Sequence, residues 1–482
     1  MLSAANVGGR ALHVVAACLL AAPSLAIGQQ DVTRIAQSDA EQRREVTITV
    51  YNQNFGLVRE VRDLTLGSTG RVALEFGDVA SQIQPETVHI RGLGDARFDV
   101  LEQNYQYDLL NPAKLLEKYV GRTIKVYRYN QATGREEEFD AEVLSVNESP
   151  ILRIGNEITY NFPGRFAFPE IPENLIAKPT LVWLLDAGER SPRVEVSYLT
   201  NNLNWKSDYV LVVNEDDTRG DLTGWVTLTN QSGASYENAR LKLVAGDVQR
   251  VTPDTRQRMM LDAVVVEAAR PGFQEEAFFE YHLYTLERPT TIRQNEQKQV
   301  TLLEGEGIGT AKRLIYYGAA QFYRSQWGQP VSNQKIGVYL DIQNTEANRL
   351  GMPLPKGIVR VYKADRSGAQ QFVGEDAIDH TPRDERIRIK VGEAFDVVGE
   401  RRQMEYRALG RCVAESSWEI ELRNHKDTAE EVLVVEPAGA DWEILSSSHP
   451  ATRVDNSTFT FTVGVGARET VVVAYRIRVR WC

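Results

Sequence analysis

The chain has 482 residues, enough for about three to four domains of ordinary size. Its apolar content of 42% and charged content of 25% are typical of a globular protein with several buried cores. The formal net charge of −11 argues against nucleic acid or anionic lipid as the main partner, because basic surfaces bind both.

Residues 1–28 have the pattern of a secretory signal peptide that is cleaved after export. Arg10 supplies a positive charge, and Ala11–Ala22 form an apolar stretch too short for a membrane span. The segment before Cys18 also resembles a bacterial lipoprotein cleavage box, although the apolar run continues past this cysteine, as in the interior of a signal peptide. We expect an exported chain, periplasmic or else secreted or on the cell surface, with no membrane span after signal removal.

Cysteine usage agrees with export. Cys18 would leave with the signal peptide, and Cys412 and Cys482 would remain as a pair in an oxidising compartment. They lie at the two ends of the last predicted domain, so a disulfide would join these ends and stabilise the domain by roughly 4 kcal/mol in the chain-entropy description. The alternative is two unpaired thiols.

Four segments repeat one pattern, in which alternating apolar residues end in an asparagine and a second apolar run follows a polar turn. The asparagines are Asn52, Asn230, Asn344 and Asn424. Alternation places one face of each strand in a core and the other in water. Asparagine suits the turn because its side chain bonds nearby backbone and because it tolerates left-handed geometry. The pattern predicts an all-β protein of several immunoglobulin-like β-sandwich domains in tandem.

One helix interrupts the strands, with Asn111 as its N-cap and Gly121 at its end. It would cap a small barrel-like module, which a proline-rich linker joins to the next domain. In chain order the predicted segments are residues 45–110 (N-terminal β domain), 111–172 (small module and linker), 180–330 (sandwich with an insertion at 252–276), 331–408 (sandwich) and 409–482 (C-terminal sandwich).

Sequence motifs of known catalytic or cofactor sites are missing: the chain has no HExxH, no paired CxxC, no glycine-rich phosphate loop and no G-x-S-x-G elbow. We therefore predict no cofactor. One acidic stretch is the candidate for metal binding or proton transfer, because carboxylates and imidazole serve both chemistries. Its candidate residues are Glu375, Asp376, Asp379 and His380. The alternative is a solvated loop between two strands.

Several blocks together resemble the domain of unknown function 4139 family, which is related to mucoidy-inhibitor-A-like proteins. The resemblance covers roughly residues 180–482 and implies an exported bacterial β-sandwich protein. It implies no activity, cofactor or catalytic residue. The blocks are Tyr198–Tyr209, Leu241–Asp247, Glu280–Pro289, Gly374–Glu385, Phe395–Arg401 and Arg423–Lys426.

Three functions remain open at this point. The first is a non-enzymatic binding or scaffold protein of the cell envelope, whose partner would be an envelope protein or a glycan. The second is a metal-dependent hydrolase that acts on envelope polymer through the acidic stretch. The third is a secreted adhesin.

Overall fold

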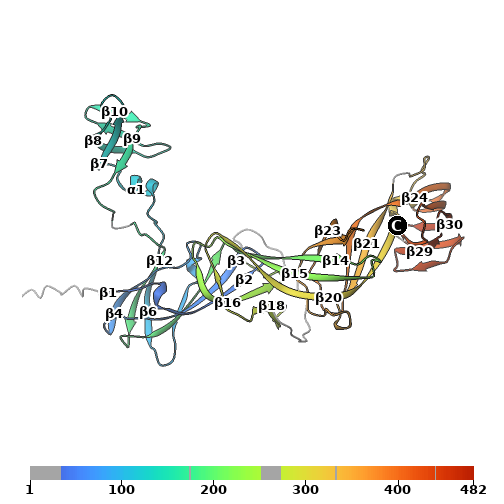
Figure 1. The fold of residues 1–482 in the computed structure, drawn as a ribbon, viewed down its shortest axis with the longest axis horizontal. Coiled ribbons are helices and arrows are strands. Elements are labelled where there is room, and N and C mark those ends of the chain that lie inside the picture. The colour runs from blue at the N-terminus through green and yellow to red at the C-terminus, as the bar shows by residue number, and fades with distance from the viewer. Residues whose placement is uncertain (1–33, 173–174, 251–272, 332–333, 440) are drawn as a thin grey trace, which may run out of the picture.

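The computed structural model describes residues 34–172, 175–250, 273–331, 334–439 and 441–482. The predicted signal peptide and residues 252–272 of the predicted insertion lie outside the described residues. Strands dominate the described part and follow one another along an elongated molecule (Figure 1). The all-β, sandwich-like prediction is confirmed. In the part of the chain that the structure describes, no helix has the length and apolar character that a bilayer crossing needs.

Two sheets form the N-terminal end. The smaller one has the order β1-β4-β12-β6, and the larger has the order β17-β18-β16-β2-β3-β13-β5, with β19 paired to β16. The smaller sheet contains β1 (Arg34–Ser38), β4 (Gly70–Phe76), β12 (Thr180–Ala187) and β6 (Phe98–Gln106). The larger contains β2 (Arg43–Tyr51), β3 (Phe55–Asp63), β5 (His89–Gly92), β13 (Arg193–Asn201), β16 (Tyr236–Ala245), β17 (Phe273–Phe278), β18 (Tyr281–Leu286) and β19 (Thr290–Ile292).

Early strands pair with late ones in both sheets. β12 pairs with β4 and β6, and β13 pairs with β3 and β5. β2 also runs parallel to β16, with Ile48 opposite Leu241. The strands of residues 45–110 are therefore completed by strands from beyond residue 180.

The small module stands apart from the smaller sheet (Figure 1). Its helix α1 (Pro112–Lys118) begins at Asn111, whose side chain accepts a hydrogen bond from Lys114 N (3.0 Å). Its antiparallel sheet, in the order β10-β9-β8-β7-β11, does not close, so the barrel-like expectation is corrected to an open sheet under a helix. Its edge strands β10 and β11 pair with β9 and β7 and are not paired with each other. The strands are β7 (Thr123–Asn130), β8 (Arg135–Ser145), β9 (Ile151–Ile154), β10 (Glu157–Tyr160) and β11 (Arg165–Ala167).

The rest of the chain forms one branched sheet that runs through the middle and C-terminal parts. Its main path is β23-β22-β14-β15-β20-β21-β24-β25-β30-β27; β26 pairs with β20 and β29, and β28 pairs with β29. The strands are β14 (Leu203–Val213), β15 (Arg219–Asn230), β20 (Glu296–Tyr317), β21 (Lys335–Gln343), β22 (Gly357–Ala364), β23 (Gln370–Ile378), β24 (Arg386–Gly410), β25 (Val413–Asn424), β26 (Glu430–Pro437), β27 (Asp441–Ser447), β28 (Ala451–Arg453), β29 (Thr458–Val465) and β30 (Thr470–Arg480).

Two long strands connect the middle part to the C-terminal sandwich. The first half of β20 pairs with β15, and its last residues pair with both β21 and β26. The first part of β24 pairs with β21, and its later part pairs with β25. β20 of the predicted segment 180–330 therefore pairs with β21 of the next segment, and β24 pairs with β25 of the C-terminal segment.

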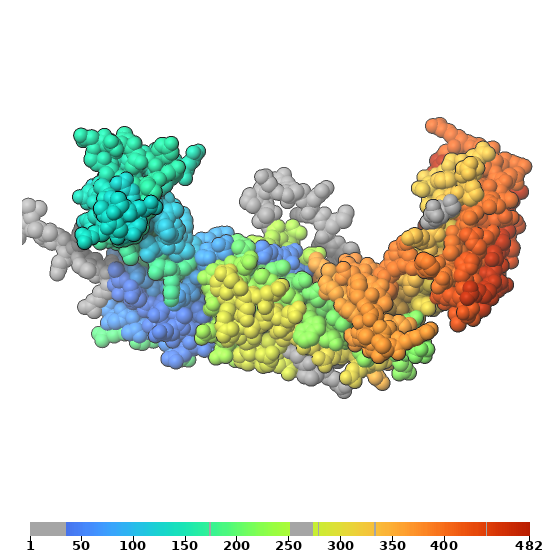
Figure 2. Space-filling model, turned by 45° about the horizontal axis from the view of Figure 1, so that its top comes forward, coloured from blue at the N-terminus to red at the C-terminus, as the bar shows by residue number. Residues whose placement is uncertain are grey.

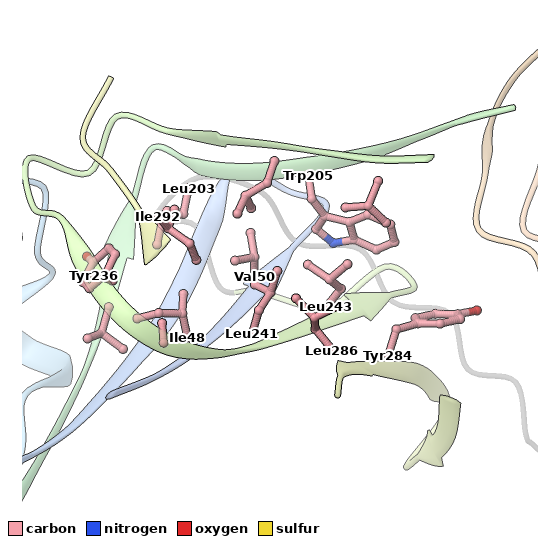
Figure 3. Packing of buried hydrophobic residues seen from close by; sticks show 14 of the residues in the cluster. Ile48, Val50, Leu203, Trp205, Tyr236, Leu241, Leu243, Tyr284, Leu286 and Ile292 are labelled. Atoms are coloured by element: carbon pink, nitrogen blue, oxygen red, sulfur yellow. The ribbon is translucent and has the colours of Figure 1, made fainter. Parts of the chain in front are cut away.

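Buried apolar residues form three clusters. The largest extends from the N-terminal sheets through the middle of the molecule, and a second fills the C-terminal sandwich. The third lies under α1 in the small module. Figure 3 shows part of the largest cluster, where Ile48 and Leu241 of the eight-stranded sheet face Leu203 of the branched sheet. One continuous core thus joins strands that are far apart in sequence.

Three of the four repeated asparagines are buried side-chain clamps. Asn230, Asn344 and Asn424 are at most 1% exposed. Each donates through Nδ2 to loop carbonyls, for example from Asn424 to Thr428 O (2.8 Å) and Gly466 O (2.9 Å). None of the three has a positive φ, so side-chain bonding, and not left-handed backbone, explains their position.

Asn424→Ala is expected to lower the free energy of unfolding by about 2–3 kcal/mol, because it leaves buried loop carbonyls without donors. Asn52 is the matched control: it is half-buried, its Nδ2 lies 3.4 Å from His380 Nε2, and within the described residues it bonds to no loop carbonyl. Asn52→Ala should cost less than about 1 kcal/mol. Urea unfolding of the two variants followed by circular dichroism checks this difference, and equal losses would contradict the clamp.

Candidate functional site

The four predicted site residues lie on β23 (Gln370–Ile378) and directly after it. Glu375 and Asp376 are neighbours on β23, so their side chains point to opposite faces. Asp379 is exposed, and His380 is half-buried. Among the described residues, no group of three or more histidine, cysteine, aspartate or glutamate side chains is placed to hold a metal ion. The geometry therefore gives the metal-site hypothesis no support.

Asp376 joins β23 to β24. Its Oδ2 accepts a hydrogen bond from Lys390 N (2.7 Å), and its Oδ1 accepts one from Ala377 N (2.9 Å). The two backbones are close here, since a Cβ added at Gly374 would overlap the carbonyl oxygen of Val391. Glu375 instead pairs with Arg360 at 3.1 Å, with its side chain 49% exposed. Asp376 thus links β23 to β24, whereas Glu375 is a surface residue.

Asp376→Ala should lower the free energy of unfolding by about 2 kcal/mol, because two backbone N–H groups lose a charged acceptor. Glu375→Ala is the matched control on the adjacent residue, with an expected loss below about 0.5 kcal/mol, as for an exposed ion pair. Urea denaturation measures both values. A larger loss for the Glu375 variant would show that Asp376 does not link the two strands.

His380 is fixed as a neutral side chain. Lys356 N donates to its Nδ1 (3.2 Å), so Nε2 carries the ring proton and needs an acceptor. Asn52 lies 3.4 Å from Nε2, and its Oδ1 is buried without a partner among the described residues. Turning that amide brings Oδ1 to Nε2–H and satisfies both groups. Burial, followed by the charge of Lys356, lowers the pKa of His380.

Strand ends converge around His380. Asp247 follows β16 and accepts from Lys356 Nζ (3.3 Å) just before β22. His282, at the start of β18, lies near enough to lower the pKa of His380 further, and its Nδ1 is 2.7 Å from Glu275 Oε1.

Three aromatic side chains lie beneath this convergence and hold its loops. Trp205 Nε1 donates to Val244 O (3.2 Å), Tyr209 OH to Pro355 O (2.7 Å) and Tyr284 OH to Pro353 O (2.9 Å). Figure 3 shows Trp205 and Tyr284 at one end of the core. Burial raises the pKa of Tyr209, which keeps its hydroxyl a donor. Asp247, Lys356 and His380 thus form a fixed group of paired polar side chains, and Trp205, Tyr209 and Tyr284 hold the neighbouring loops in place.

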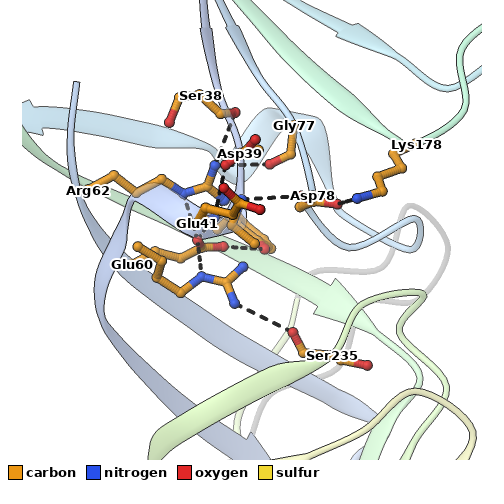
Figure 4. A network of polar contacts seen from close by, with 12 residues as sticks. Ser38, Asp39, Glu41, Glu60, Arg62, Gly77, Asp78, Lys178 and Ser235 are labelled. Carbon is orange, nitrogen blue, oxygen red and sulfur yellow. Dashed lines mark hydrogen bonds and ion pairs between the residues drawn. The ribbon is translucent and has the colours of Figure 1, made fainter. Parts of the chain in front are cut away.

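A second charged site, which sequence reasoning missed, lies near the N-terminal sheets (Figure 4). Glu60 and Arg62 of β3 are fully buried, and the Arg43 side chain of β2 is 9% exposed. Glu60 Oε2 accepts from Arg43 Nε (2.8 Å) and from Arg62 Nη2 (2.8 Å), and its Oε1 accepts from Tyr198 OH (3.2 Å). Although burial opposes it, the charges of Arg62 and then Arg43 hold the pKa of Glu60 below its usual value.

The backbone and a ring hold Arg62 in place. Its Nη1 donates to Ser38 O (3.2 Å) and Gly77 O (3.0 Å), and its guanidinium lies 3.6 Å from the centre of the Phe76 ring. The sequence carries a signal for this burial, because the alternation of β3 places Glu60 and Arg62 on the same face as Val58.

A cleft of about 630 Å³ opens next to this charged cluster. Arg43 forms part of its wall, and Asp78, Lys178, Ser235 and Glu237 are among the other residues around it. Lys178 Nζ pairs with Asp78 at 2.6 Å across one side, as Figure 4 shows. Strands far apart in sequence therefore meet at a cavity with charged walls.

The C-terminal sandwich buries a third charged group. Arg401 and Glu436 are both 0% exposed and form an ion pair. Arg401 Nη1 also donates to Tyr475 OH (3.2 Å), and Tyr323 OH donates to Glu436. At the edge of the same sandwich Cys412 and Cys482 form a disulfide with their Cα atoms 5.6 Å apart.

Comparison with known protein families gives one match. The family described as "Domain of unknown function (DUF4139)" matches residues 194–482. The chain belongs to this family. The DUF4139 region contains His380, the Arg401–Glu436 pair and the disulfide, whereas Arg43, Glu60 and Arg62 precede it. A comparison with curated proteins found no match. The relation to mucoidy-inhibitor-A-like proteins stays a prediction.

Proposed function

We propose that this protein is an exported, non-enzymatic binding or scaffold protein of the cell envelope. The observation that carries the proposal is the sharing of β20 and β24 between the middle part and the C-terminal sandwich. Shared ladders resist bending between the two parts, because rotation would break backbone hydrogen bonds. Such a frame suits the presentation of separated surfaces to a partner at a fixed distance.

The structural hydrogen bonds of the charged side chains also support a non-enzymatic role. Asp376, His380 and Glu436 each bond to backbone or to another side chain in ways that fix the fold. A catalytic carboxylate or histidine would instead face a place where substrate can sit. The Cys412–Cys482 disulfide supports an exported location, because disulfides persist in oxidising compartments.

The test follows the full chain in a bacterial host. Cell fractionation first assigns the chain to periplasm, surface or medium, and recovery from the medium would favour the adhesin. Purified protein is then incubated with isolated envelope polymer and with envelope proteins, and both sedimentation and released soluble fragments are measured. We expect binding without release. Release of fragments that His380→Ala abolishes would replace the scaffold with a hydrolase.

A further inference from the structure

The buried charges beside the cleft do not balance. Arg43 and Arg62 carry two positive charges, Glu60 carries one negative charge, and all three form one hydrogen-bonded group. The neighbouring Tyr198 and Tyr236 stay neutral, because burial raises the pKa of both hydroxyls. A surplus positive charge in a protein interior is costly unless an anion or water compensates it.

The Arg401–Glu436 pair gives the internal comparison. It has one positive and one negative charge, and the hydroxyls of Tyr323 and Tyr475 hydrogen-bond to it. The same fold therefore balances a buried guanidinium elsewhere. The surplus at Arg43 is a particular property of the cleft wall.

The Arg43 guanidinium presents N–H donors to the cleft. Arg43 donates through Nε to Glu60 and through Nη1 to Ser235 O at 3.5 Å, and no acceptor within the described residues contacts its Nη2. The side chain is held on one side and has donors left on the other. A guanidinium fixed in this way matches the two oxygens of a carboxylate.

The mouth of the cleft has the opposite sign. Apart from Arg43, the charged residues that line the cleft are four carboxylates and two cations, Arg44 and Lys178. Lys178 pairs with Asp78, and Arg44 shares Asp63 with Arg193. Glu41, Glu45 and Glu237 are exposed and, among the described residues, form no ion pair. Their charges would repel a polyanion and attract a cationic group.

We propose that this cleft binds a zwitterionic small molecule or peptide end, with its carboxylate on Arg43 and its ammonium group toward the glutamates of the mouth. This ligand class deepens the proposed binding role and rests on it. The volume of about 630 Å³ admits a molecule of a few residues. No group-transfer step is involved.

Titration calorimetry with glycylglycine, acetate and tripolyphosphate as probes tests the proposal. We expect glycylglycine to bind most tightly and acetate more weakly, with no measurable binding of tripolyphosphate. Arg43→Gln should weaken glycylglycine binding at least tenfold, and Arg59→Gln, at an exposed arginine of β3 that does not line the cleft, should leave it unchanged. Glu237→Gln should weaken glycylglycine and leave acetate unchanged. Failure of glycylglycine to bind, or equal binding by the Arg43 variant, overturns the proposal.

A second measurement needs no substitution and covers the case in which the Arg43 variant does not fold. Phenylglyoxal modifies accessible arginines, and mass spectrometry locates the modified sites. Glycylglycine should slow modification at Arg43 several-fold and leave Arg59, outside the cleft, unaffected, whereas equal rates at Arg43 with and without ligand contradict the proposal. Envelope sedimentation is run in parallel. If sedimentation persists while glycylglycine fails to bind, the cleft proposal falls and the scaffold role stands.

Discussion

Glu436→Gln is expected to lower the free energy of unfolding of the C-terminal sandwich by about 3–5 kcal/mol, because it leaves the charge of Arg401 buried and uncompensated. The guanidinium has no route to water, since its carbon lies 5.0 Å from the Phe322 ring centre and 5.6 Å from that of Trp418. Tyr475 accepts a hydrogen bond from Arg401 and cannot supply a negative charge, because burial raises the pKa of its hydroxyl.

Urea unfolding followed by circular dichroism measures the loss. Glu443→Gln is the matched control, because Glu443 pairs with Arg478 at 3.1 Å while its side chain is 64% exposed; the expected loss is below about 0.5 kcal/mol. Replacing both buried partners with Arg401→Met and Glu436→Leu should recover most of the stability, since no unpaired charge remains. A Glu436→Gln loss below about 1 kcal/mol would contradict the assignment of a desolvated pair.

Local pattern was sufficient to predict the strands and their caps. Alternation in β2, β15, β21 and β25 fixes which face is buried, and Asn230, Asn344 and Asn424 follow that face into the core. The N-cap at Asn111 was also readable, because capping depends on residues within one turn. These features are set by neighbours in sequence.

The continuity of the long strand β20 could not be predicted from local sequence pattern. Gly305, Gly307 and Gly309 would favour a turn if sequence alone were considered, whereas β20 continues through all three. Gly307 has φ of 61°, and the ladder with β15 shifts register near Gly305. The glycines therefore mark an irregularity inside one strand, and a turn and a bulge share the same residue preference.

The candidate sites depend on contacts between distant segments. Asp247, Lys356 and His380 meet only because parallel pairing of β2 with β16 and of β14 with β22 aligns strand ends. No local signal specifies such a pairing. The charged residues of β3 follow its alternation into the core, and partners from distant segments, such as Arg43, Tyr198 and the carbonyl of Gly77, complete their hydrogen bonds.

Reduction of the Cys412–Cys482 disulfide is expected to lower the free energy of unfolding of the C-terminal sandwich by roughly 4 kcal/mol, because the unfolded chain regains the entropy of an open loop. The two cysteines are 70 positions apart. β25 begins directly after Cys412 and pairs along its length with β30, which ends two residues before Cys482. The Cα separation of 5.6 Å lies within the range of natural disulfides, so the crosslink demands no shift of the paired strands.

Thermal and urea unfolding with and without reductant measure the effect, and the Cys412→Ser, Cys482→Ser double variant is the control that reductant should leave unchanged. Because the crosslink acts on the unfolded chain and the Arg401–Glu436 pair acts on the folded core, the losses from reduction and from Glu436→Gln should add. An additive loss of this size would unfold the C-terminal sandwich before the middle part, which keeps its own core. If both parts still unfold together, β20 and β24 couple them more strongly than their separate cores stabilise them.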